Sequence, residues 1–312
     1  MQNKILITGG FGTLGSYLTI YFLKLGYEVY ITSSSTNKIP NFFLGVKVIP
    51  LDLMNPLAGF DQINKFKFDI VIHLASYNEY FDKNYYWQSY RVNTEGTSSL
   101  INNLNLDNLK HFIYLSTYHV YGKNEGFINE DLAANPLNDY AASHLAAEFI
   151  VRKHSISSGL PATIIRLTNS YGCPINKNKI NRNLLLNDLA LMALKEEKLT
   201  LKSAPNIRRD FICMSDVAKA LHEIIVFGKP KISGQIFNLS YGKSISLLDA
   251  AKEIRKAYLI YKGKKLNIDY TKDFKKKDNL IIDSSLINKL LSFKPKFKIV
   301  EEALKTFKLI QG

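Results

Sequence analysis

The sequence predicts an α/β fold: a doubly wound parallel sheet with a smaller C-terminal lobe. Three observations predict it. An apolar run at 4–8 leads through a glycine-rich turn into a helical stretch. Apolar runs and helical stretches then alternate, which is typical of parallel strands joined by crossover helices. After Leu167 the alternation loosens, so the sheet should be built mainly from 1–168 and the lobe mainly from 169–312.

Seven short runs are predicted to be strands, and several of them are almost wholly apolar, as expected for strands buried on both faces of a parallel sheet. They lie at 4–8, 28–32, 47–50, 70–74, 112–116, 162–167 and 235–239. Helices are predicted at 15–25, 94–103, 140–157, 216–227 and 247–258. The run at 235–239 would return the chain to the sheet from within the lobe, which otherwise holds 176–205 and the tail after Gly242.

Composition excludes several classes of protein. With 46% apolar and 22% charged residues over 312 positions, the chain can bury a full core and is not a disordered tail. No apolar run reaches the roughly 18 residues of a membrane helix, and a first strand at Lys4 leaves no room for a signal peptide. We therefore expect a cytoplasmic protein without a membrane partner. Cys173 and Cys213 have no histidine at ligand spacing, which predicts reduced thiols and no metal site.

The formal net charge of +14 favours phosphate-bearing partners. The lysines are scattered apart from a denser stretch over 262–277, and no recognition helix or aromatic ribonucleoprotein motif occurs. We therefore expect no nucleic-acid partner. A phosphorylated small molecule would use only a few of these charges.

The glycine-rich turn reads Thr8-Gly9-Gly10-Phe11-Gly12-Thr13-Leu14-Gly15. Gly9 lets the chain turn off the strand, Gly12 lets the backbone approach a pyrophosphate, and Gly15 lets the helix pack close to the sheet. The helix N-terminus offers unpaired N–H groups and partial positive charge to phosphates. This combination predicts a dinucleotide-binding domain over 1–168, with a cofactor held by Gly9, Phe11, Gly12, Thr13, Leu14 and Gly15.

The second and third strands bear on which dinucleotide is bound. NAD sites normally have an acidic residue at the end of the second strand and NADP sites a nearby Arg, whereas this chain has Thr32-Ser33-Ser34-Ser35 with Lys38 beyond. Ser33 could bond ribose hydroxyls or a phosphate, so we favour NAD and leave NADP open. After the third strand, Asp52 and Leu53 should lie beside the adenine, where Asp52 would bond the amino group or, alternatively, cap a helix.

Further motifs follow the turn in order along nearly the whole chain. They are His73-Leu74-Ala75-Ser76, Asn93-Thr94-Glu95-Gly96-Thr97, Ser116-Thr117-Tyr118-His119-Val120-Tyr121-Gly122, Tyr140-Ala141-Ala142-Ser143-His144, Arg166-Leu167-Thr168-Asn169-Ser170-Tyr171-Gly172, Arg209-Asp210-Phe211 and Lys277-Asp278. Together they resemble the extended short-chain dehydrogenase/reductases, the NAD-dependent epimerase/dehydratase family that acts on nucleotide sugars. The resemblance implies a Rossmann fold, cofactor contacts from Leu74 and Ala75, and catalytic roles for Thr117 and Tyr140.

Tyr140 and His144 lie one helical turn apart. Oxidising a sugar hydroxyl requires removal of its proton while hydride leaves the same carbon for the nicotinamide. A tyrosine with a pKa of about 10 is a poor base at neutral pH unless a neighbouring cation favours its phenolate. The family carries Lys for this purpose. Here His144 could donate to the cofactor ribose and, when protonated, lower the pKa of the phenol.

Two interpretations of this site stay open. In the first, Tyr140 is the general base or acid, Thr117 orients the hydroxyl and His144 is a pH-sensitive helper. In the second, the site binds a dinucleotide without chemistry, as a regulator would. Sugar-nucleotide 4,6-dehydratases of the family carry Asp-Glu directly after the catalytic Thr, where this chain has Tyr118-His119. Elimination of water is therefore not expected.

The resemblance also implies contacts to the substrate. Arg209 would fork onto the nucleotide diphosphate and Lys275 would add a point charge, although each could instead be an ordinary surface residue. Asn169 should face the substrate or the nicotinamide amide. Ser76 and Tyr77 should line the sugar pocket, or simply pack after the fourth strand.

These residues predict an NAD(P)-dependent oxidoreductase that acts at C4 of an NDP-hexose or NDP-heptose in bacterial surface polysaccharide biosynthesis. A 4-epimerase is the alternative. In its lysine-rich and asparagine-rich composition and in His144, the chain resembles GDP-heptose 4-dehydrogenases from capsule clusters. This resemblance implies a GDP-linked substrate. The family further implies a homodimer formed by the helices at 94–103 and 140–157.

Overall fold

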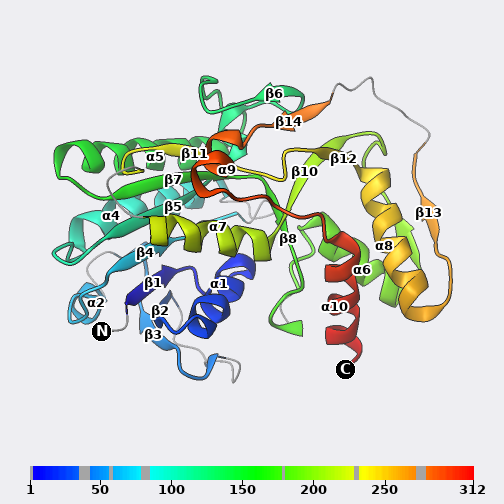
Figure 1. The fold of residues 1–312 in the computed structure, drawn as a ribbon, viewed down its shortest axis with the longest axis horizontal. Helices are drawn as coiled ribbons and strands as arrows, with labels where there is room; N and C mark the ends of the chain where they lie inside the picture. Colours follow the sequence, from blue (N-terminus) through cyan, green and yellow to red (C-terminus); the bar gives the residue numbers. More distant parts are fainter. Residues whose placement is uncertain are drawn as a thin grey trace. The chain divides into compact units, whose positions relative to one another are not determined.

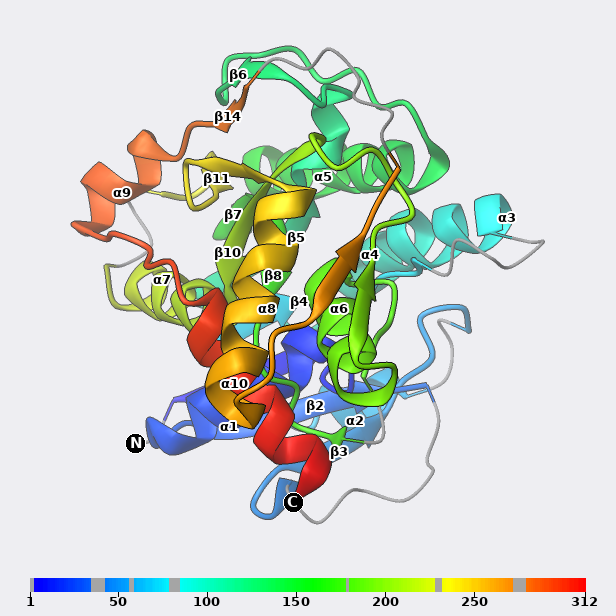
Figure 2. The same ribbon diagram turned by 90° about the vertical axis from the view of Figure 1, so that its right-hand side faces the viewer.

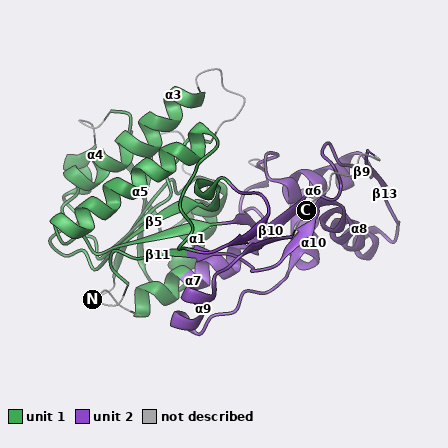
Figure 3. Ribbon diagram, turned by 90° about the horizontal axis from the view of Figure 1, so that it is seen from above, with its two compact units in different colours: residues 1–122, 130–167, 221–237 green, residues 123–129, 168–220, 238–312 purple. Residues whose placement is uncertain are grey.

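A computed structural model describes residues 3–34, 43–55, 59–78, 85–177, 180–227, 232–271 and 279–312 (Figure 1). The chain forms two compact units that interleave along the sequence. Unit 1 comprises residues 1–122, 130–167 and 221–237, and unit 2 comprises residues 123–129, 168–220 and 238–312 (Figure 3).

A seven-stranded sheet in the order β11-β7-β5-β4-β1-β2-β3 forms the centre of unit 1. Its strands are β1 (Lys4–Thr8), β2 (Glu28–Ser33), β3 (Lys47–Pro50), β4 (Ile70–His73), β5 (His111–Thr117), β7 (Ala162–Leu167) and β11 (Ile236–Leu239). All neighbours from β3 to β7 pair in parallel. The strand order reverses between β1 and β4, so the predicted doubly wound sheet is confirmed.

The central strands are buried on both faces, which is why they read as continuous apolar runs. Ile5, Leu6 and Ile7 of β1 and Val71 and Ile72 of β4 have no exposed surface. The predicted bounds agree with the structure for β1, β3 and β7, and the other four strands differ by one residue at one or both ends. Apolar runs therefore located the sheet well.

Helices cover both faces of this sheet (Figures 1 and 3). Helix α1 (Thr13–Lys24) lies on one face beside the end of α7 (Met214–Phe227), where Tyr21 and Phe22 contact the ring of His222. The opposite face carries α4 (Gly96–Asn103) and α5 (Asp139–Ser157). Shorter elements are α2 (Phe60–Ile63), α3 (Tyr85–Ser89), the π-helix η2 (Tyr90–Glu95) and the 3₁₀-helix η3 (Tyr118–Tyr121).

The prediction that a helix begins at 94 is wrong. Elements α3 and η2 run without a break into α4, so helical backbone begins at Tyr85. The earlier turns were missed because Tyr86, Trp87 and Tyr90 are exposed aromatic residues that break the apolar period of a half-buried helix.

The described residues of unit 2 form three small sheets, ordered β12-β10-β8, β13-β9 and β14-β6. The strands are β6 (Gly126–Ile128), β8 (Asn169–Tyr171), β9 (Lys198–Thr200), β10 (Arg208–Cys213), β12 (Ser244–Ser246), β13 (Asn267–Asp269) and β14 (Leu280–Ile282). Its helices are α6 (Leu185–Lys195), α8 (Leu247–Lys262), α9 (Ser285–Leu291) and α10 (Ile299–Gln311). Helices α6, α8 and α10 pack together around an apolar core of their own (Figures 1 and 2).

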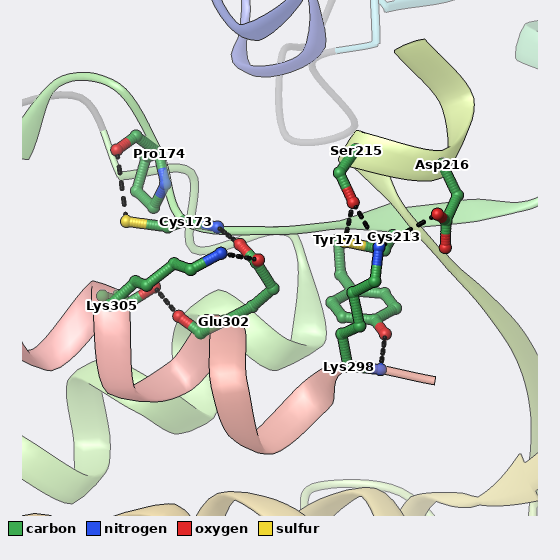
Figure 4. Close-up of polar contacts among 10 residues, drawn as sticks. Tyr171, Cys173, Pro174, Cys213, Ser215, Asp216, Lys298, Glu302 and Lys305 are labelled. Carbon is green, nitrogen blue, oxygen red and sulfur yellow. Dashed lines mark hydrogen bonds and ion pairs between the residues drawn. The ribbon is translucent and has the colours of Figure 1, made fainter. Parts of the chain in front are cut away.

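Both cysteines lie in unit 2 and are free. Figure 4 shows their surroundings: the backbone N–H of Cys173 donates to Glu302, and the Cys213 sulfur lies 3.1 Å from the Ser215 hydroxyl. Burial raises the pKa of both thiols, so both are protonated near neutral pH. Within the residues that the structure describes, no group of three or more His, Cys, Asp or Glu side chains could hold a metal ion.

Across the described part of the chain, no helix has both the length and the apolar character needed to cross a membrane.

Candidate functional site

The turn after β1 depends on glycine for two steric reasons. Gly9 has φ 69°, and a Cβ there would lie 2.9 Å from the backbone nitrogen of Ala75. A Cβ on Gly15 would lie 2.1 Å from the carbonyl oxygen of Gly9, so α1 packs against the turn itself. The close approach that Gly15 allows is therefore to the residue that directly follows β1. A Cβ on Gly12 would meet, among the described residues, only the Gly9 carbonyl at 3.2 Å, so that side of the turn is open.

Helix α1 begins without a side-chain cap. Its N-cap residue is Gly12, and its first turn contains no acidic residue. The first bond of the helix runs from Ser16 N–H to the Gly12 carbonyl at 2.8 Å, so the N–H groups of Thr13, Leu14 and Gly15 have no acceptor within the helix. An anion at this end would meet those donors and the positive end of the helix dipole. Phe11 packs edge-on against Phe43, with ring centroids 5.3 Å apart.

His73, at the carboxyl end of β4, is fully buried and uses both ring nitrogens. Nε2 lies 2.9 Å from the Thr97 hydroxyl, which donates its own proton to the Asn93 carbonyl and therefore accepts from Nε2–H. Nδ1 lies 2.6 Å from the Thr8 hydroxyl and accepts from it. Burial lowers the pKa of His73 to about 3, so the ring is neutral.

The same network positions Leu74 and Ala75. Both backbone N–H groups donate to the Thr8 hydroxyl oxygen, at 3.1 and 3.2 Å. The loops that follow the two central strands are thereby tied together at the point where the strand order reverses. Ligands of doubly wound sheets bind at this point.

Asn93 lies in the π-helix η2 and is 1% exposed. Its Oδ1 accepts from the Tyr77 backbone N–H at 2.7 Å, and its Nδ2 donates to the Ser143 hydroxyl at 3.0 Å. The Thr94 hydroxyl donates to the Ser143 carbonyl, also at 3.0 Å. The Ser76 and Tyr77 loop is thus tied through η2 to the first turns of α5. Single π-helical turns are frequent at functional sites.

Tyr140 and His144 lie at the start of α5, with ring centroids 4.6 Å apart and planes at 71°. The Asn138 side chain caps this helix by accepting from Ala141 N–H at 2.8 Å. His144 is 3% exposed, and its Nδ1 lies 2.8 Å from the Tyr114 hydroxyl on β5. Its Nε2 is buried and has no hydrogen-bond partner among the described residues.

His144 is a neutral imidazole. Its pKa is lowered to about 3, mainly by burial and also by the nearby His73 and His119. The expectation that a protonated His144 reduces the pKa of the Tyr140 phenol is therefore wrong, because this buried ring does not hold a charge near neutral pH.

Thr117 ends β5 and caps η3. Its hydroxyl oxygen accepts from the His119 backbone N–H at 3.2 Å, so the hydroxyl can still donate its own proton. The His119 ring centroid lies 4.2 Å from that of Tyr118 and 6.4 Å from that of Tyr140. His119 thus connects the end of β5 with the first turn of α5.

A buried ion pair fixes α5 against the sheet. Glu148, two turns after Tyr140, lies 2.6 Å from Arg166 and accepts from the Ser116 hydroxyl at 2.5 Å. Ser116 and Arg166 are cross-strand neighbours on β5 and β7. Because Tyr140 and Glu148 share one face of α5, this contact sets where the phenol lies along β5.

The residues predicted to surround the adenosine half of the cofactor lie at the end of β2 and just after β3, on the side of β1 opposite to β4. Ser33 is the last residue of β2. The Asp52 side chain accepts from the Met54 backbone N–H at 2.9 Å within a turn. The alternative that Asp52 caps a helix is wrong, because residues 53–55 are not helical and α2 has Gly59 as its N-cap. Leu53 is buried, and a Cβ on Gly96 would lie 2.9 Å from its Cβ.

Two adjacent arginines on β10 of unit 2 differ in their contacts. Arg208 donates to Ser244 through Nε and Nη2, at 3.1 and 2.6 Å. Arg209 is half-buried, and its side chain has no hydrogen bond or ion pair within the described part of the chain. Arg209 is therefore the one of the pair that is available to an anion.

Asp210 and Asn169 form a polar cluster beside these arginines. The Asp210 carboxylate accepts from the Thr168 hydroxyl and from the N–H groups of Tyr241 and Gly242, at 2.8 to 2.9 Å. Burial raises the pKa of Asp210 to about 6. The Asn169 amide donates to the Asp210 carbonyl at 2.9 Å, which holds the side chain within unit 2. Lys275, Lys277 and Asp278, like Ser35 and Lys38, lie outside the described residues.

Residues 5–240 match the model of the NAD-dependent epimerase/dehydratase family. The chain belongs to this family. A dTDP-D-glucose 4,6-dehydratase from Dictyostelium discoideum is 33% identical over 284 residues, which cover 81% of this chain and 61% of that enzyme, less than two thirds of its length. A GDP-6-deoxy-D-talose 4-dehydrogenase from Aggregatibacter actinomycetemcomitans is 28% identical over 226 residues, covering 71% of this chain and 70% of that enzyme.

Among solved structures, the UDP-glucuronic acid 4-epimerase from Bacillus cereus in complex with NAD superposes with a TM-score of 0.82 and 23% identity, over 99% of this chain and 98% of that one. This likeness confirms the predicted extended short-chain dehydrogenase/reductase fold. The family match confirms NAD as the predicted cofactor. Three features fit a dinucleotide within the described residues: the open side of the turn at Gly12, the start of α1 without a side-chain cap, and Nε2 of His144 without a partner.

Sequence reasoning missed Tyr114, the partner of His144 in this epimerase/dehydratase family member. One signal was present: Tyr114 is a hydroxyl-bearing residue in the middle of an apolar run predicted to be buried on both faces. A buried phenol must find a hydrogen-bond partner. Which partner it finds depends on how α5 packs on β5, and that was not readable from the strand alone.

Proposed function

We propose that this family member is an NAD-dependent sugar-nucleotide oxidoreductase that acts at C4 of an NDP-hexose or NDP-heptose in bacterial surface polysaccharide biosynthesis. The observation that carries the proposal is the Tyr140 and His144 pair at the start of α5, with their rings in contact and one ring nitrogen unpartnered among the described residues. The similarity to a GDP-6-deoxy-D-talose 4-dehydrogenase supports a C4 reaction and a GDP-linked sugar.

In this proposal each unit has one task. Unit 1 is the dinucleotide-binding domain, with the turn from Gly9 to Gly15 at the pyrophosphate and Ser33, Asp52 and Leu53 toward the adenosine. Unit 2 is the substrate lobe, in which Arg209 binds the nucleotide diphosphate because its guanidinium has no protein partner among the described residues. Lys275 adds a second positive charge, and Asn169 contributes a carbonyl oxygen to the same ligand.

The chemistry follows from three side chains of unit 1. Bound NAD supplies a hydride acceptor for the C4 carbon. The phenolate form of Tyr140 takes the proton of the C4 hydroxyl and becomes the neutral phenol, while the hydride leaves C4. Thr117 donates a hydrogen bond to the same substrate oxygen and so orients it. His144 donates from Nε2 to the nicotinamide ribose, while the loop that carries Ser76 and Tyr77 lines the sugar pocket.

Elimination of water is not part of the proposal, although one relative is a 4,6-dehydratase. That reaction needs an acid and a base directly after the catalytic Thr, and η3 has Tyr118 and His119 there. Tyr118 is 2% exposed and therefore packed into the core. Neither side chain is a carboxylate.

The homodimer is proposed through α4 and α5. Phe149 and Ile156 are 62% and 81% exposed and lie seven residues apart, so they share one face of α5. Light scattering should give a dimer mass, and Phe149→Glu with Ile156→Glu should give a monomer. A monomeric parent protein would contradict this part of the proposal.

The reaction can be tested by incubating the purified protein with NAD and UDP-, dTDP- or GDP-linked hexoses. We expect reduced nicotinamide in the absorbance spectrum and, by mass spectrometry, a product that has lost two hydrogens. An isomer of unchanged mass would identify an epimerase, and a product that has lost water would identify a dehydratase. NAD binding with no sugar turned over would instead favour the regulator. Tyr140→Phe serves as the control that separates enzyme chemistry from background oxidation.

A further inference from the structure

His144 forms a hydrogen bond with Tyr114 and a ring contact with Tyr140. The two side chains are 3% and 2% exposed, and the Tyr114 hydroxyl lies 2.8 Å from Nδ1 of His144. Nε2 of the same ring is buried and has no partner within the described residues. One nitrogen is therefore bonded to the protein, and the other is available to a group from outside the described residues.

The position of the imidazole proton follows from counting donors and acceptors. If Nδ1 carried the proton, it would donate to Tyr114, the phenol proton would have no acceptor among the described residues, and Nε2 would be a lone pair without a donor. If Tyr114 donates to Nδ1 instead, only Nε2–H remains unpaired. Unsatisfied buried groups are costly, so the second arrangement is favoured. Burial also raises the pKa of Tyr114 well above its ordinary value, which keeps its proton in place.

The groups around the ring do not favour a charged His144. His73 on β4 and His119 on η3 both disfavour an added proton, and Tyr140 lies against the ring from the same helix. Glu148 is the acidic residue on this face of α5, and its charge is already balanced by the ion pair with Arg166. These surroundings are consistent with the low pKa of His144.

We propose that Tyr114 is a positioning residue that holds His144 as the neutral Nε2–H tautomer, so that position 144 offers the cofactor a hydrogen-bond donor rather than a cation. This inference rests on the proposed function, because the acceptor it supplies is a ribose hydroxyl of the bound dinucleotide. The neutral ring can offer this hydrogen bond at any pH well above its pKa of about 3. It does not stabilise the phenolate of Tyr140 as a lysine would.

The tautomer can be read without any ligand. In protein labelled with ¹⁵N-histidine, long-range proton–nitrogen spectra distinguish the two neutral tautomers and the cation, and His144→Gln assigns the signal. We expect the Nε2–H form at neutral pH and no titration of this ring down to about pH 4. A cation or an Nδ1–H form at neutral pH would overturn the proposal.

Binding of NAD in the absence of substrate provides the second measurement. Tyr114→Phe should weaken binding about tenfold, since the tautomer is no longer fixed. Tyr258→Phe is the matched control in unit 2, and it should leave binding unchanged. Among the described residues the Tyr258 hydroxyl bonds only to Glu197, at 3.4 Å. Equal affinity of Tyr114→Phe and the parent would contradict the role of Tyr114.

A pair of substitutions at position 144 separates a donor from a cation. The Gln side chain can accept from Tyr114 and donate from its amide, whereas Leu can do neither. His144→Leu should therefore lose more affinity for NAD than His144→Gln, by about tenfold. Equal losses would contradict the donor role, and this pair decides the question if Tyr114→Phe does not fold. If the parent protein binds no NAD, the proposed function fails; if it binds NAD but these differences are absent, only this inference fails.

Discussion

Two buried histidines of unit 1 have the same low pKa and opposite hydrogen-bonding states. His73 and His144 both have a pKa of about 3, mainly because burial disfavours the charged ring. Both nitrogens of His73 are hydrogen-bonded to threonines, whereas Nε2 of His144 has no partner among the described residues. Burial and pKa therefore do not separate a structural histidine from the one that we propose faces the cofactor. The unfilled hydrogen-bonding position does.

The same difference recurs on β10 of unit 2. Arg208 is bound to Ser244 by two hydrogen bonds, and Arg209 has no partner in the described range. Neighbours of one residue type thus divide into a side chain that holds the fold and a side chain that remains available. We call His73 and Arg208 saturated, because their side chains find their hydrogen bonds within the protein, and His144 and Arg209 unsaturated, because each has a donor without a partner among the described residues. If the comparison is sound, substitutions at the saturated residues should cost stability. Substitutions at the unsaturated residues should cost binding or turnover.

The largest effect is expected at Tyr140, which lies against the unsaturated histidine. Tyr140→Phe removes the phenolic oxygen and keeps the ring contact with His144, so NAD binding and the melting temperature should change little. Turnover should fall by about 10²–10⁴-fold, the usual contribution of a general acid or base. Steady-state kinetics and an NAD titration on the same preparation check this. Turnover close to that of the parent would mean that another group transfers the proton.

The saturated histidine should act through stability instead. His73→Leu leaves the hydroxyls of Thr8 and Thr97 without their shared partner and should destabilise the protein by about 2–4 kcal/mol in urea unfolding. His154→Leu, at a half-buried position near the end of α5, should cost under about 1 kcal/mol. Similar losses for the two variants would show that the His73 network adds little to the fold.

Acid should destabilise the protein through both histidines. Their folded pKa of about 3 lies below the ordinary 6.5, so the unfolded chain binds protons that the folded chain does not. Stability present above pH 6.5 is therefore lost as the pH falls, by about 2–3 kcal/mol for each ring at about pH 4. His144→Leu should remove one of these two contributions and flatten the decline. Urea unfolding at several pH values measures it, and parallel curves would mean that His144 titrates normally.

The sequence predicted the sheet better than the site, for physical reasons. Strands buried on both faces are written as apolar runs, and the glycines at 9 and 15 have steric causes that leave a local signature. The three-residue strands of unit 2, such as β8 and β14, pair with partners far along the chain and carry no local pattern. The prediction that a protonated His144 lowers the pKa of Tyr140 was wrong, because the charge of this ring depends on its burial by other elements. Tyr114 was missed because its role exists only once α5 packs on β5.

Arg209 provides the corresponding test in unit 2. Arg209→Ala should raise the KM for the nucleotide sugar by about 10–30-fold with a small change in kcat, since a guanidinium–phosphate contact is lost in substrate and transition state alike. Arg208→Ala should leave KM nearly unchanged and lower stability by about 1 kcal/mol, because its two bonds to Ser244 are structural. The opposite assignment of KM and stability would reverse the comparison on β10.

The smallest expected effect is a shift in the pH profile caused by a charge at position 144. His144→Lys introduces a cation beside the ring that lies 4.6 Å from the present imidazole, and a cation favours the phenolate of Tyr140. The rising limb of the profile for sugar oxidation should therefore move toward lower pH by about one unit. His144→Gln, which is neutral like the parent ring, should keep the parent profile even where its rate is lower. If the Lys and Gln variants have the same profile, position 144 does not influence the ionisation of Tyr140, and the difference between the two histidines concerns cofactor binding alone.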